Sequence, residues 1–274
     1  MIDDLLRPFE LEFFRNGVLV AAIAGGLLGA LGVYVVLKGM SYIGHGLSHA
    51  IFGGYAASTL TGVSVLLGAG AWGIATGLLI DRISRRRVLG SDAAIGVITS
   101  ASFALGLVLF ALFGRAGRDF DAALFGSVLG VSTGDVWAVV VVAIAAAVLI
   151  LARYRELLFA TFDPEVADGS GIPVARVDAL LTVVLAAAIL VSMNVLGVTL
   201  VAAAIVIPAS TARLLTSSFA RMLGLATALG VACAVIGMNL SYHLDVQSGP
   251  AIVLTATAAF ALAGVARSAR AAWT

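Results

Sequence analysis

Two of the three histidines in this chain, His45 and His49, stand four residues apart in a stretch that is otherwise typical of an apolar helix. On a helix, this spacing puts both imidazoles on one face, one turn apart. Two nitrogen donors arranged in this way can share one first-row divalent cation. Two ligands are too few for a closed structural zinc site. The pair is therefore typical of a transport site, which binds a cation weakly enough to release it.

A structural role is the alternative for the same pair, because each imidazole could simply hydrogen-bond a neighbouring helix. If the span starts near Ser41, His49 lies about 12 Å deep in the hydrocarbon, where an ionisable side chain must find partners and by default marks a pathway or a site. That depth, together with the helical spacing, favours a metal site. The third histidine, His243, lies close to Asp245 and is a weaker candidate ligand on the outer side. A solvated loop histidine is the more ordinary explanation there.

Sequence signatures of common enzymes are missing from the chain. It has no GxxxxGK[ST] phosphate loop, and its only lysine, Lys38, follows Leu37. No glutamate lies between His45 and His49, which excludes an HExxH metalloprotease helix. Ser48 and His49 are adjacent, so on a helix they point in different directions and do not form a nucleophile pair. We expect a protein that is not itself an enzyme.

Composition places the chain in the membrane. Hydrophobic residues make up 61% of its 274 residues and charged residues 11%, against roughly 25% charged residues in a soluble domain. The net charge of +1 argues against a nucleic-acid partner, which would require a basic face. The single cysteine, Cys233, cannot form an internal disulfide.

The apolar stretches predict an all-α multispan bundle with about nine spans, since a bilayer core needs roughly 20 apolar residues of helix. A further segment at 124–132 could be a half-helix that enters the membrane without crossing it. The nine predicted spans are 17–37, 42–60, 62–80, 93–113, 135–152, 177–193, 197–212, 222–242 and 250–266. Gly25 and Gly29 lie four residues apart in the first of them, a spacing that predicts close helix packing.

The distribution of basic residues predicts the orientation, because positively charged loops stay in the cytoplasm. With the N-terminus outside and the C-terminus in the cytoplasm, only Arg7, Arg15, Arg115 and Arg118 of the sixteen basic residues face outward. Residues 1–16 carry acids among apolar residues, so we do not expect them to be a signal peptide. They predict an amphipathic helix on the outer surface, ahead of a transmembrane domain over 17–274.

The longest polar segment on the cytoplasmic side runs over about 153–176, and it predicts a short helix. Asp163 is a good N-cap, Pro164 suits the first helical position, and Glu165 favours the positive end of the helix. Gly169 or Gly171 can end it.

Several apolar residues of this loop are predicted to be exposed: Leu157, Leu158, Phe159, Phe162 and Val166. They favour docking to a cytosolic protein. The residues alone leave open the alternative that the loop folds back onto its own bundle.

The segment "GVYVVLKGMSYIGHGLSHAIFGGYAAS" resembles the first-loop motif of the ABC-3 permeases, the integral subunits of ABC transporters that import zinc, manganese or iron. In that motif, a turn with a basic residue precedes Met-Ser-Phe-x-Gly-Asp-x-Leu-Ser-His-Ala. Five further stretches are similar to family segments in the same order: "SDAAIGVITSASFALGLVL", "LFGSVLGVSTGDV", "LLFATFDPEVADGSGIPV", "VLGVTLVAAAIVIPASTARLL" and "SYHLDVQSGPAIVL". The resemblance covers nearly the whole chain.

This resemblance implies a type II importer permease fold in a bacterial cytoplasmic membrane. Two permease copies would line one pathway, with cytosolic ATP-binding subunits and an extracytoplasmic metal-binding protein as partners. ATP would be used by the partner subunit, and no cofactor would be permanently bound. The resemblance also places the ATPase-coupling helix at Phe162, Asp163, Pro164, Glu165 and Val166.

The family's metal-contacting aspartate and histidine fall on His45 and His49, so the carboxylate is replaced here. Imidazole suits zinc better than manganese, and the pair therefore favours zinc as the transported ion. Manganese or iron transport by the same type of permease is the alternative. A proton-coupled secondary transporter is a rival from another class. Because imidazoles titrate near pH 6 to 7, transport is expected to fade as the pair protonates.

Overall fold

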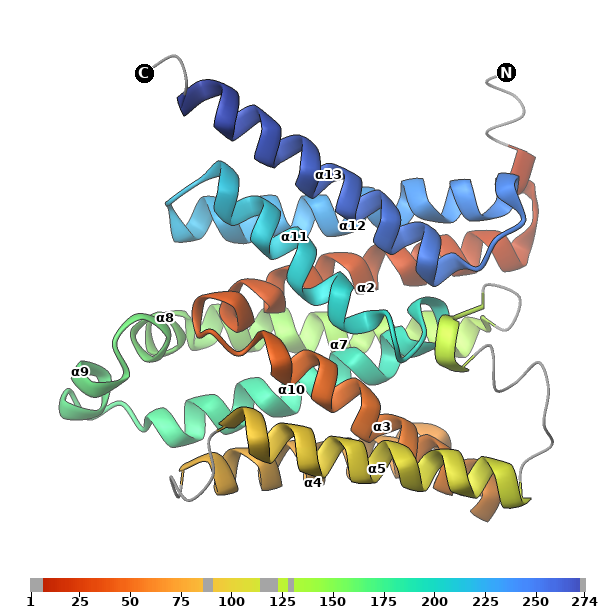
Figure 1. Ribbon diagram of the computed structural model, residues 1–274, viewed down its shortest axis with the longest axis horizontal. Coiled ribbons are helices and arrows are strands. Elements are labelled where there is room, and N and C mark those ends of the chain that lie inside the picture. Colours follow the sequence, from red (N-terminus) through yellow and green to blue (C-terminus); the bar gives the residue numbers. More distant parts are fainter. Residues whose placement is uncertain (1–6, 86–90, 114–122, 128–130, 272–274) are drawn as a thin grey trace.

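The computed structural model describes residues 7–85, 91–113, 123–127 and 131–271, and every regular element in these ranges is helical (Figure 1). The elements are η1 (Arg7–Glu10), α2 (Glu12–Leu37), α3 (Ser41–Thr61), α4 (Val65–Arg85), α5 (Ser91–Phe113), α7 (Thr133–Ala152), α8 (Tyr154–Phe162), α9 (Pro164–Gly169), α10 (Val174–Leu196), α11 (Val201–Leu215), α12 (Phe219–Leu244) and α13 (Ser248–Ala271).

Each of the nine predicted spans overlaps one helix, but the predicted count is not confirmed. Among the described residues, seven helices are long and apolar enough to cross a membrane: α2, α4, α5, α7, α10, α12 and α13. α11 is shorter, at 15 residues. α3 has 21 residues and falls outside the seven, because histidine, serine, threonine and glycine dilute its apolar residues.

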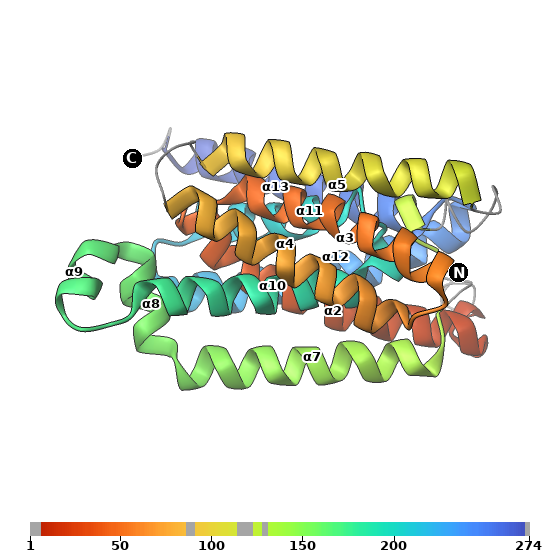
Figure 2. The same cartoon turned by 90° about the horizontal axis from the view of Figure 1, so that it is seen from below.

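Two groups of helices lie on either side of a central pair (Figure 1). α11, α12 and α13 contact one another on one side, and α3, α4 and α5 do so on the other. α2 packs on α11 and α12, α10 packs on α4, and α2 and α10 contact each other. In the perpendicular view, α5 and α7 lie on opposite edges of the bundle (Figure 2). The central pair therefore connects the two groups, and α3 also touches α11.

α2 and α12 pack along a glycine seam, formed by Gly25 and Gly29 of α2 and by Ala226 and Gly230 of α12. A methyl group added at Gly25 would overlap the Gly230 carbonyl oxygen, and one at Gly230 would overlap the Gly25 carbonyl oxygen. One at Gly29 would overlap the Ala226 carbonyl oxygen. The close packing expected from the glycine spacing is confirmed. Small residues let helix backbones approach closely where lipid offers no hydrophobic driving force.

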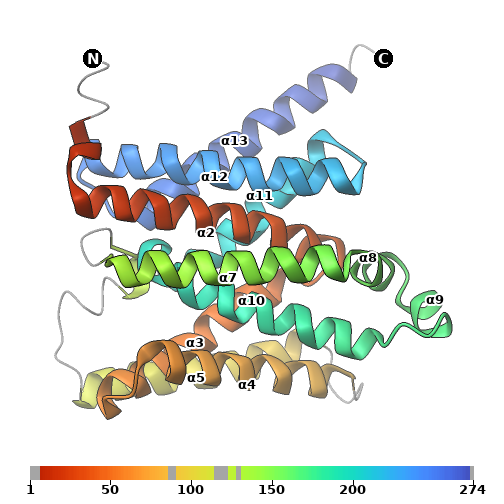
Figure 3. The ribbon, with the colours of Figure 1, turned by 180° about the vertical axis from the view of Figure 1, so that it is seen from behind.

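Apolar content alone does not identify the central helix. α7 has the highest mean hydropathy of the seven candidate spans, yet only 17% of its most apolar window is buried, against 78% for α2. From behind, α7 lies across the outside of α2 and α10 (Figure 3). Its exposed valine, isoleucine and leucine side chains suit contact with lipid acyl chains.

The N-terminal segment predicted over 1–16 differs from a separate surface helix. η1 covers Arg7–Glu10 and α2 already begins at Glu12, while residues 1–6 lie outside the described residues. Phe14 is buried and packs edge-on against Tyr242 of α12 at 5.3 Å between ring centroids. The end of the segment is therefore the first turn of a long helix. The outer-surface position of the remainder stays a prediction.

The half-helix predicted over 124–132 is helical only at 124–125 among its described residues, and 128–130 lie outside them. Its backbone pairs with the loop between α10 and α11. The Val198 amide donates to the Ala123 carbonyl at 3.0 Å, and the Thr199 hydroxyl donates to the Leu124 carbonyl at 2.6 Å. Gly126, with φ +80°, fits against the Val195 carbonyl, where a Cβ would overlap it. These contacts fix the segment across one end of the bundle.

Candidate functional site

The predicted histidine pair lies on one face of α3, together with Tyr42 one turn before it. We call Tyr42, His45 and His49 the histidine face. The two imidazole ring centroids are 4.2 Å apart, with 47° between the ring planes. Tyr42 is 64% exposed, His45 is exposed and His49 is half-buried. The helical spacing therefore brings the two rings together as expected.

Hydrogen bonding fixes which nitrogen of His49 is free. His49 Nδ1 lies 2.9 Å from the His45 carbonyl oxygen, which can only accept a hydrogen bond. In the neutral ring, Nδ1 therefore carries the hydrogen, and Nε2 keeps its lone pair. The Ser48 hydroxyl donates to the same carbonyl at 2.9 Å. A histidine ring held through one nitrogen with the other unprotonated is the usual arrangement of a metal ligand.

α3 is held in place by α5 and α4. The Ser102 hydroxyl of α5 donates to the Ala50 carbonyl of α3 at 2.9 Å, and it accepts from Trp72 Nε1 of α4, also at 2.9 Å. Phe103 of α5 packs against the His49 ring, with centroids 4.6 Å apart. Buried hydroxyls and an aromatic wall thus orient the histidine-bearing helix, while the histidine face itself stays open.

Among the residues that the structure describes, His45 and His49 have no third histidine, cysteine, aspartate or glutamate beside them. Within the described residues, no group of three or more histidine, cysteine, aspartate or glutamate side chains is close enough to hold a metal ion. A single copy of the chain therefore offers two imidazoles on an accessible face. Such a set fits transient binding of a cation better than permanent coordination.

His243 and Asp245 lie at the end of α12 and do not join the histidine pair. Asp245 ends the helix in a left-handed conformation, with φ +52°. It lines a hollow of about 390 Å³ together with Phe13, Tyr242 and Gln247. The His243 ring packs edge-on against Tyr242 at 5.4 Å. Their role as outer ligands stays a prediction.

The loop predicted to face the cytoplasm forms two short helices, α8 and α9, which project from one end of the bundle (Figure 1). The Asp163 carboxylate accepts from the Val166 amide at 3.0 Å, and Pro164 takes the first position of α9. α9 ends at Gly169, and Gly171 follows with φ +85°. The capping predicted for this helix is confirmed at each of these positions.

Burial divides this loop into an inner and an outer face. Phe159, Phe162 and Val166 are 49%, 60% and 53% exposed. The prediction that Leu157 is exposed is wrong, because α8 turns this side chain into the bundle and leaves it 1% exposed. α8 thus folds back onto its own bundle, whereas α9 and its flanking Phe162 face outward. Both alternatives left open by the sequence occur, one in each helix.

The lone lysine was not among the predicted functional residues, yet it joins three elements. Lys38 Nζ lies 2.9 Å from Asp178 Oδ1 of α10 and donates to the Ala160 carbonyl of α8 at 2.7 Å. Its rarity was the available signal, because it is the only lysine in 274 residues. Its partners could not be found from the sequence, since Ala160 is 122 positions away.

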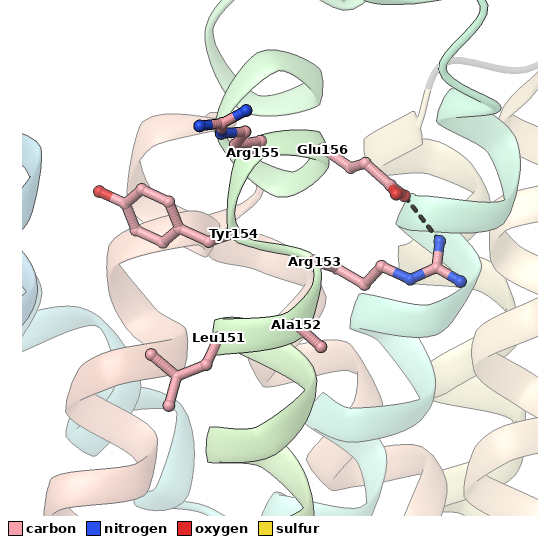
Figure 4. A pocket seen from close by; sticks show the side chains of 6 residues that line it. All are labelled: Leu151, Ala152, Arg153, Tyr154, Arg155 and Glu156. Carbon is pink, nitrogen blue, oxygen red and sulfur yellow. Dashed lines mark hydrogen bonds and ion pairs between the residues drawn. The ribbon is translucent and has the colours of Figure 1, made fainter.

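A second ion pair of the same loop stays within α8. Arg153 donates to the Glu156 carboxylate at 2.7 Å across three residues, and both side chains lie at the corner between α7 and α8 (Figure 4). Arg153 is 51% exposed and Glu156 is 33% exposed. Both side chains are more exposed than those of Lys38 and Asp178, so this pair provides a reference for the buried Lys38 pair.

Comparison with known proteins gives the same result for sequence and for fold. The model of the ABC 3 transport family matches residues 10–267. The manganese transport system membrane protein MntC of Listeria monocytogenes is 34% identical over 254 residues, covering 93% of this chain and 90% of MntC. A membrane protein of Haemophilus influenzae, named for an iron transport system, is 35% identical and covers 96% of this chain and 97% of its own.

A solved structure has the same architecture. PsaBC from Streptococcus pneumoniae, in complex with Fab, contains a chain that superposes with a TM-score of 0.88 at 31% identity. The match covers 96% of this chain and 95% of the other. The zinc preference expected from the histidine pair is not supported by these relatives, whose names refer to manganese and iron. The alternative expected beside it, manganese or iron, fits them better.

Proposed function

The chain belongs to the ABC 3 transport family, and we propose that it is the membrane-spanning subunit of an ATP-driven importer for manganese. Two observations together support this proposal. Relatives named for manganese transport match over more than nine tenths of the chain, and two imidazoles lie together on an accessible face of α3.

Iron(II) is the second candidate cargo, because one residue favours it. Imidazole suits iron(II) better than manganese, which prefers carboxylate and carbonyl oxygens. His45 supplies imidazole where the family motif has aspartate. The relative named for iron transport covers this chain as fully as those named for manganese. His45 would then adjust the preference between two neighbouring first-row metals.

The open histidine face supports the proposal that two copies of the chain work together. In one copy, Tyr42 and His45 are exposed, and two imidazoles do not complete a coordination shell. A second copy facing the first would supply two more imidazoles around the same ion. Each ion would leave by exchanging ligands along this face, which requires binding that is weak in any one position.

Coupling to a cytosolic ATP-binding subunit is proposed for α9 and its flanks. Phe162 and Val166 are exposed apolar side chains, and Asp163 and Glu165 add acidic groups beside them. Such a surface suits docking into a groove of a partner, in the manner of a helix inserted into a hydrophobic groove. ATP hydrolysis would belong to that partner, and an extracytoplasmic metal-binding protein would deliver the ion.

The orientation with the N-terminus outside and the C-terminus in the cytoplasm stays part of the proposal. The C-terminal ends of α11 and α13 and the N-terminal ends of α10 and α12 lie on the same side of the bundle as α8 and α9 (Figure 1). By sequence position, these ends and the α7–α8 corner carry Arg153, Arg176, Arg213, Arg221 and Arg267. A concentration of arginine is expected on the cytoplasmic side. That side is also the one on which an ATP-binding subunit must dock.

Metal uptake by the complete complex tests the proposal. Vesicles of the chain with its ATP-binding subunit and binding protein should accumulate radioactive manganese or iron(II) in the presence of ATP, and should exclude zinc. His45→Asp should raise the preference for manganese over iron(II), because it restores an oxygen ligand. Selective ATP-driven accumulation of zinc would refute the proposed cargo. Accumulation without ATP would instead place the chain among secondary transporters.

A further inference from the structure

The Lys38 side chain binds a backbone carbonyl that the sequence leaves without its usual hydrogen-bond donor, beside the coupling helix. The Ala160 carbonyl would normally accept from the amide four residues later. That residue is Pro164, which has no amide hydrogen. Lys38 Nζ donates to the Ala160 carbonyl instead, at 2.7 Å. The proline that starts α9 therefore leaves one acceptor of α8 free, and the only lysine of the chain binds it.

The second contact of Lys38 holds the other flank of α9. Asp178 lies near the start of α10, and its carboxylate is 2.9 Å from Lys38 Nζ. The Lys38 and Asp178 side chains are only 10% and 18% exposed. An ion pair so removed from water is screened much less than one at the surface. α8 and α10, which precede and follow α9 in the sequence, are thus both bound to one ammonium group.

The turn that carries Lys38 connects directly to the histidine-bearing helix. Lys38 is the C-cap of α2 and lies three residues before Ser41, where α3 begins. Gly39 has φ +67°, and the Met40 amide donates to the Val35 carbonyl at 2.9 Å. This hydrogen-bonding pattern closes the helix end tightly. A displacement of Lys38 therefore moves the start of α3, and His45 lies one turn further on.

We propose that Lys38 is a positioning residue that transmits movement of the coupling segment, α8 and α9, to the histidine face of α3. The inference rests on the proposed function, because it assigns this link to an ATP-driven cycle. Movement of α9 under a docked partner changes the positions of Ala160 and Asp178, to which Lys38 is bound. The α2–α3 turn follows, and His45 and His49 shift relative to the facing copy. Lys38 itself does not touch the ion.

Coupling is measured as metal imported per ATP hydrolysed, in vesicles that contain the complete complex. Lys38→Met should lower this ratio by about tenfold, a typical coupling between distant sites, while ATP hydrolysis stays within about twofold of the natural chain. Lys38→Arg keeps both contacts possible and should recover most of the ratio. Arg153→Met is the matched control, because it removes an ion pair of α8 that does not reach α3; its ratio should not change. An unchanged ratio in Lys38→Met would overturn the inference.

Asp178→Asn keeps the polar contact, removes the charge, and gives a second test if Lys38→Met fails to assemble. It should lower the ratio by a smaller factor, and the combined variant should be no worse than Lys38→Met alone. Additive losses in the two variants would show that the residues act separately and would contradict the proposed link.

A readout that does not depend on transport separates this inference from the proposed cargo. Tyr42→Cys, combined with Cys233→Ser, places one thiol on the histidine face, and its modification rate by a water-soluble maleimide should change when ATP is added. Lys38→Met should abolish that change. If Lys38→Met abolishes the ATP response but the natural chain imports neither manganese nor iron(II), the proposed cargo is wrong and the link stands. If Lys38→Met leaves the response intact, the link is wrong.

Discussion

The glycine seam and the histidine face both interrupt apolar helices with residues that contribute little to hydrophobic burial. In the seam, Gly25 and Gly230 leave room for a neighbouring backbone, and nothing larger fits. On the histidine face, His45 is exposed and the ring of His49 is half-buried. The seam is therefore specified by packing, whereas the face makes few contacts that the fold requires. The comparison separates residues kept for the fold from residues available for transport.

The largest expected effect is in the seam. Gly230→Ala would press a methyl group against the Gly25 backbone, and we expect a loss of about 3 kcal/mol or more of stability, because two backbones must move apart. Gly224→Ala is the control on the same helix, since nothing lies within 4 Å of an added Cβ there. It should stabilise the chain by about 0.5 to 1 kcal/mol. Thermal unfolding in detergent measures both changes in stability. Equal changes in the two variants would contradict the view that close backbone packing specifies the seam.

His49→Ala should lower metal uptake strongly and stability only slightly, the reverse of the change expected in the seam. Metal uptake should fall by more than about 100-fold, because a ligand is lost outright and even outer-shell changes typically cost 10–100-fold in affinity. Stability should change by no more than about 1 kcal/mol, since the ring is only half-buried. Uptake and thermal unfolding of the same preparation give both quantities. Normal uptake by a folded His49→Ala variant would show that the pair does not bind the ion.

Ser102→Ala tests a polar residue that we expect to serve the fold rather than transport, although it lies near the histidine face. Its hydroxyl connects α3 to Trp72, and removal leaves the indole donor unpaired. We expect a loss of about 1 to 2 kcal/mol of stability, with unchanged selectivity among manganese, iron and zinc. A change in metal selectivity without a loss of stability would show that Ser102 serves transport rather than the fold.

The smallest expected effect is that of pH. A protonated imidazole has no lone pair for a metal, so uptake should decline severalfold between about pH 7.5 and about pH 5.5. Initial uptake rates across this range provide the measurement. A flat profile for the natural chain would argue against imidazole ligation.

Local chemistry was predictable from the sequence. Asp163 and Pro164 specify the start of α9 through rules that involve neighbouring residues only, and the four-residue spacing of His45 and His49 places their rings together. The glycine spacing likewise predicted close packing, although not that α12 would be the partner. Each of these inferences depends on geometry within one helix, where sequence distance and spatial distance agree.

Contacts between distant segments were not predictable in the same way. The Lys38 contacts depend on how α2, α8 and α10 pack, and the burial of Leu157 depends on the direction in which α8 turns. The expectation of zinc had a related weakness. It inferred the preferred metal from the chemical hardness of two ligands, whereas that preference depends on the whole coordination shell. Nine apolar stretches were visible, but whether α3 and α11 cross a membrane depends on their neighbours rather than on their own composition.

The polar composition of α3 has a consequence for how the chain is made. A segment with two histidines and many small polar residues partitions poorly from the translocon into lipid by itself. α3 packs mainly against α4 and α5, which are synthesised after it. We expect α3 to be retained at the translocon until these later helices emerge and shield it. Ribosome-bound chains that end before α5 should leave the α5-facing side of α3 accessible to water, and chains in which α5 has emerged should not.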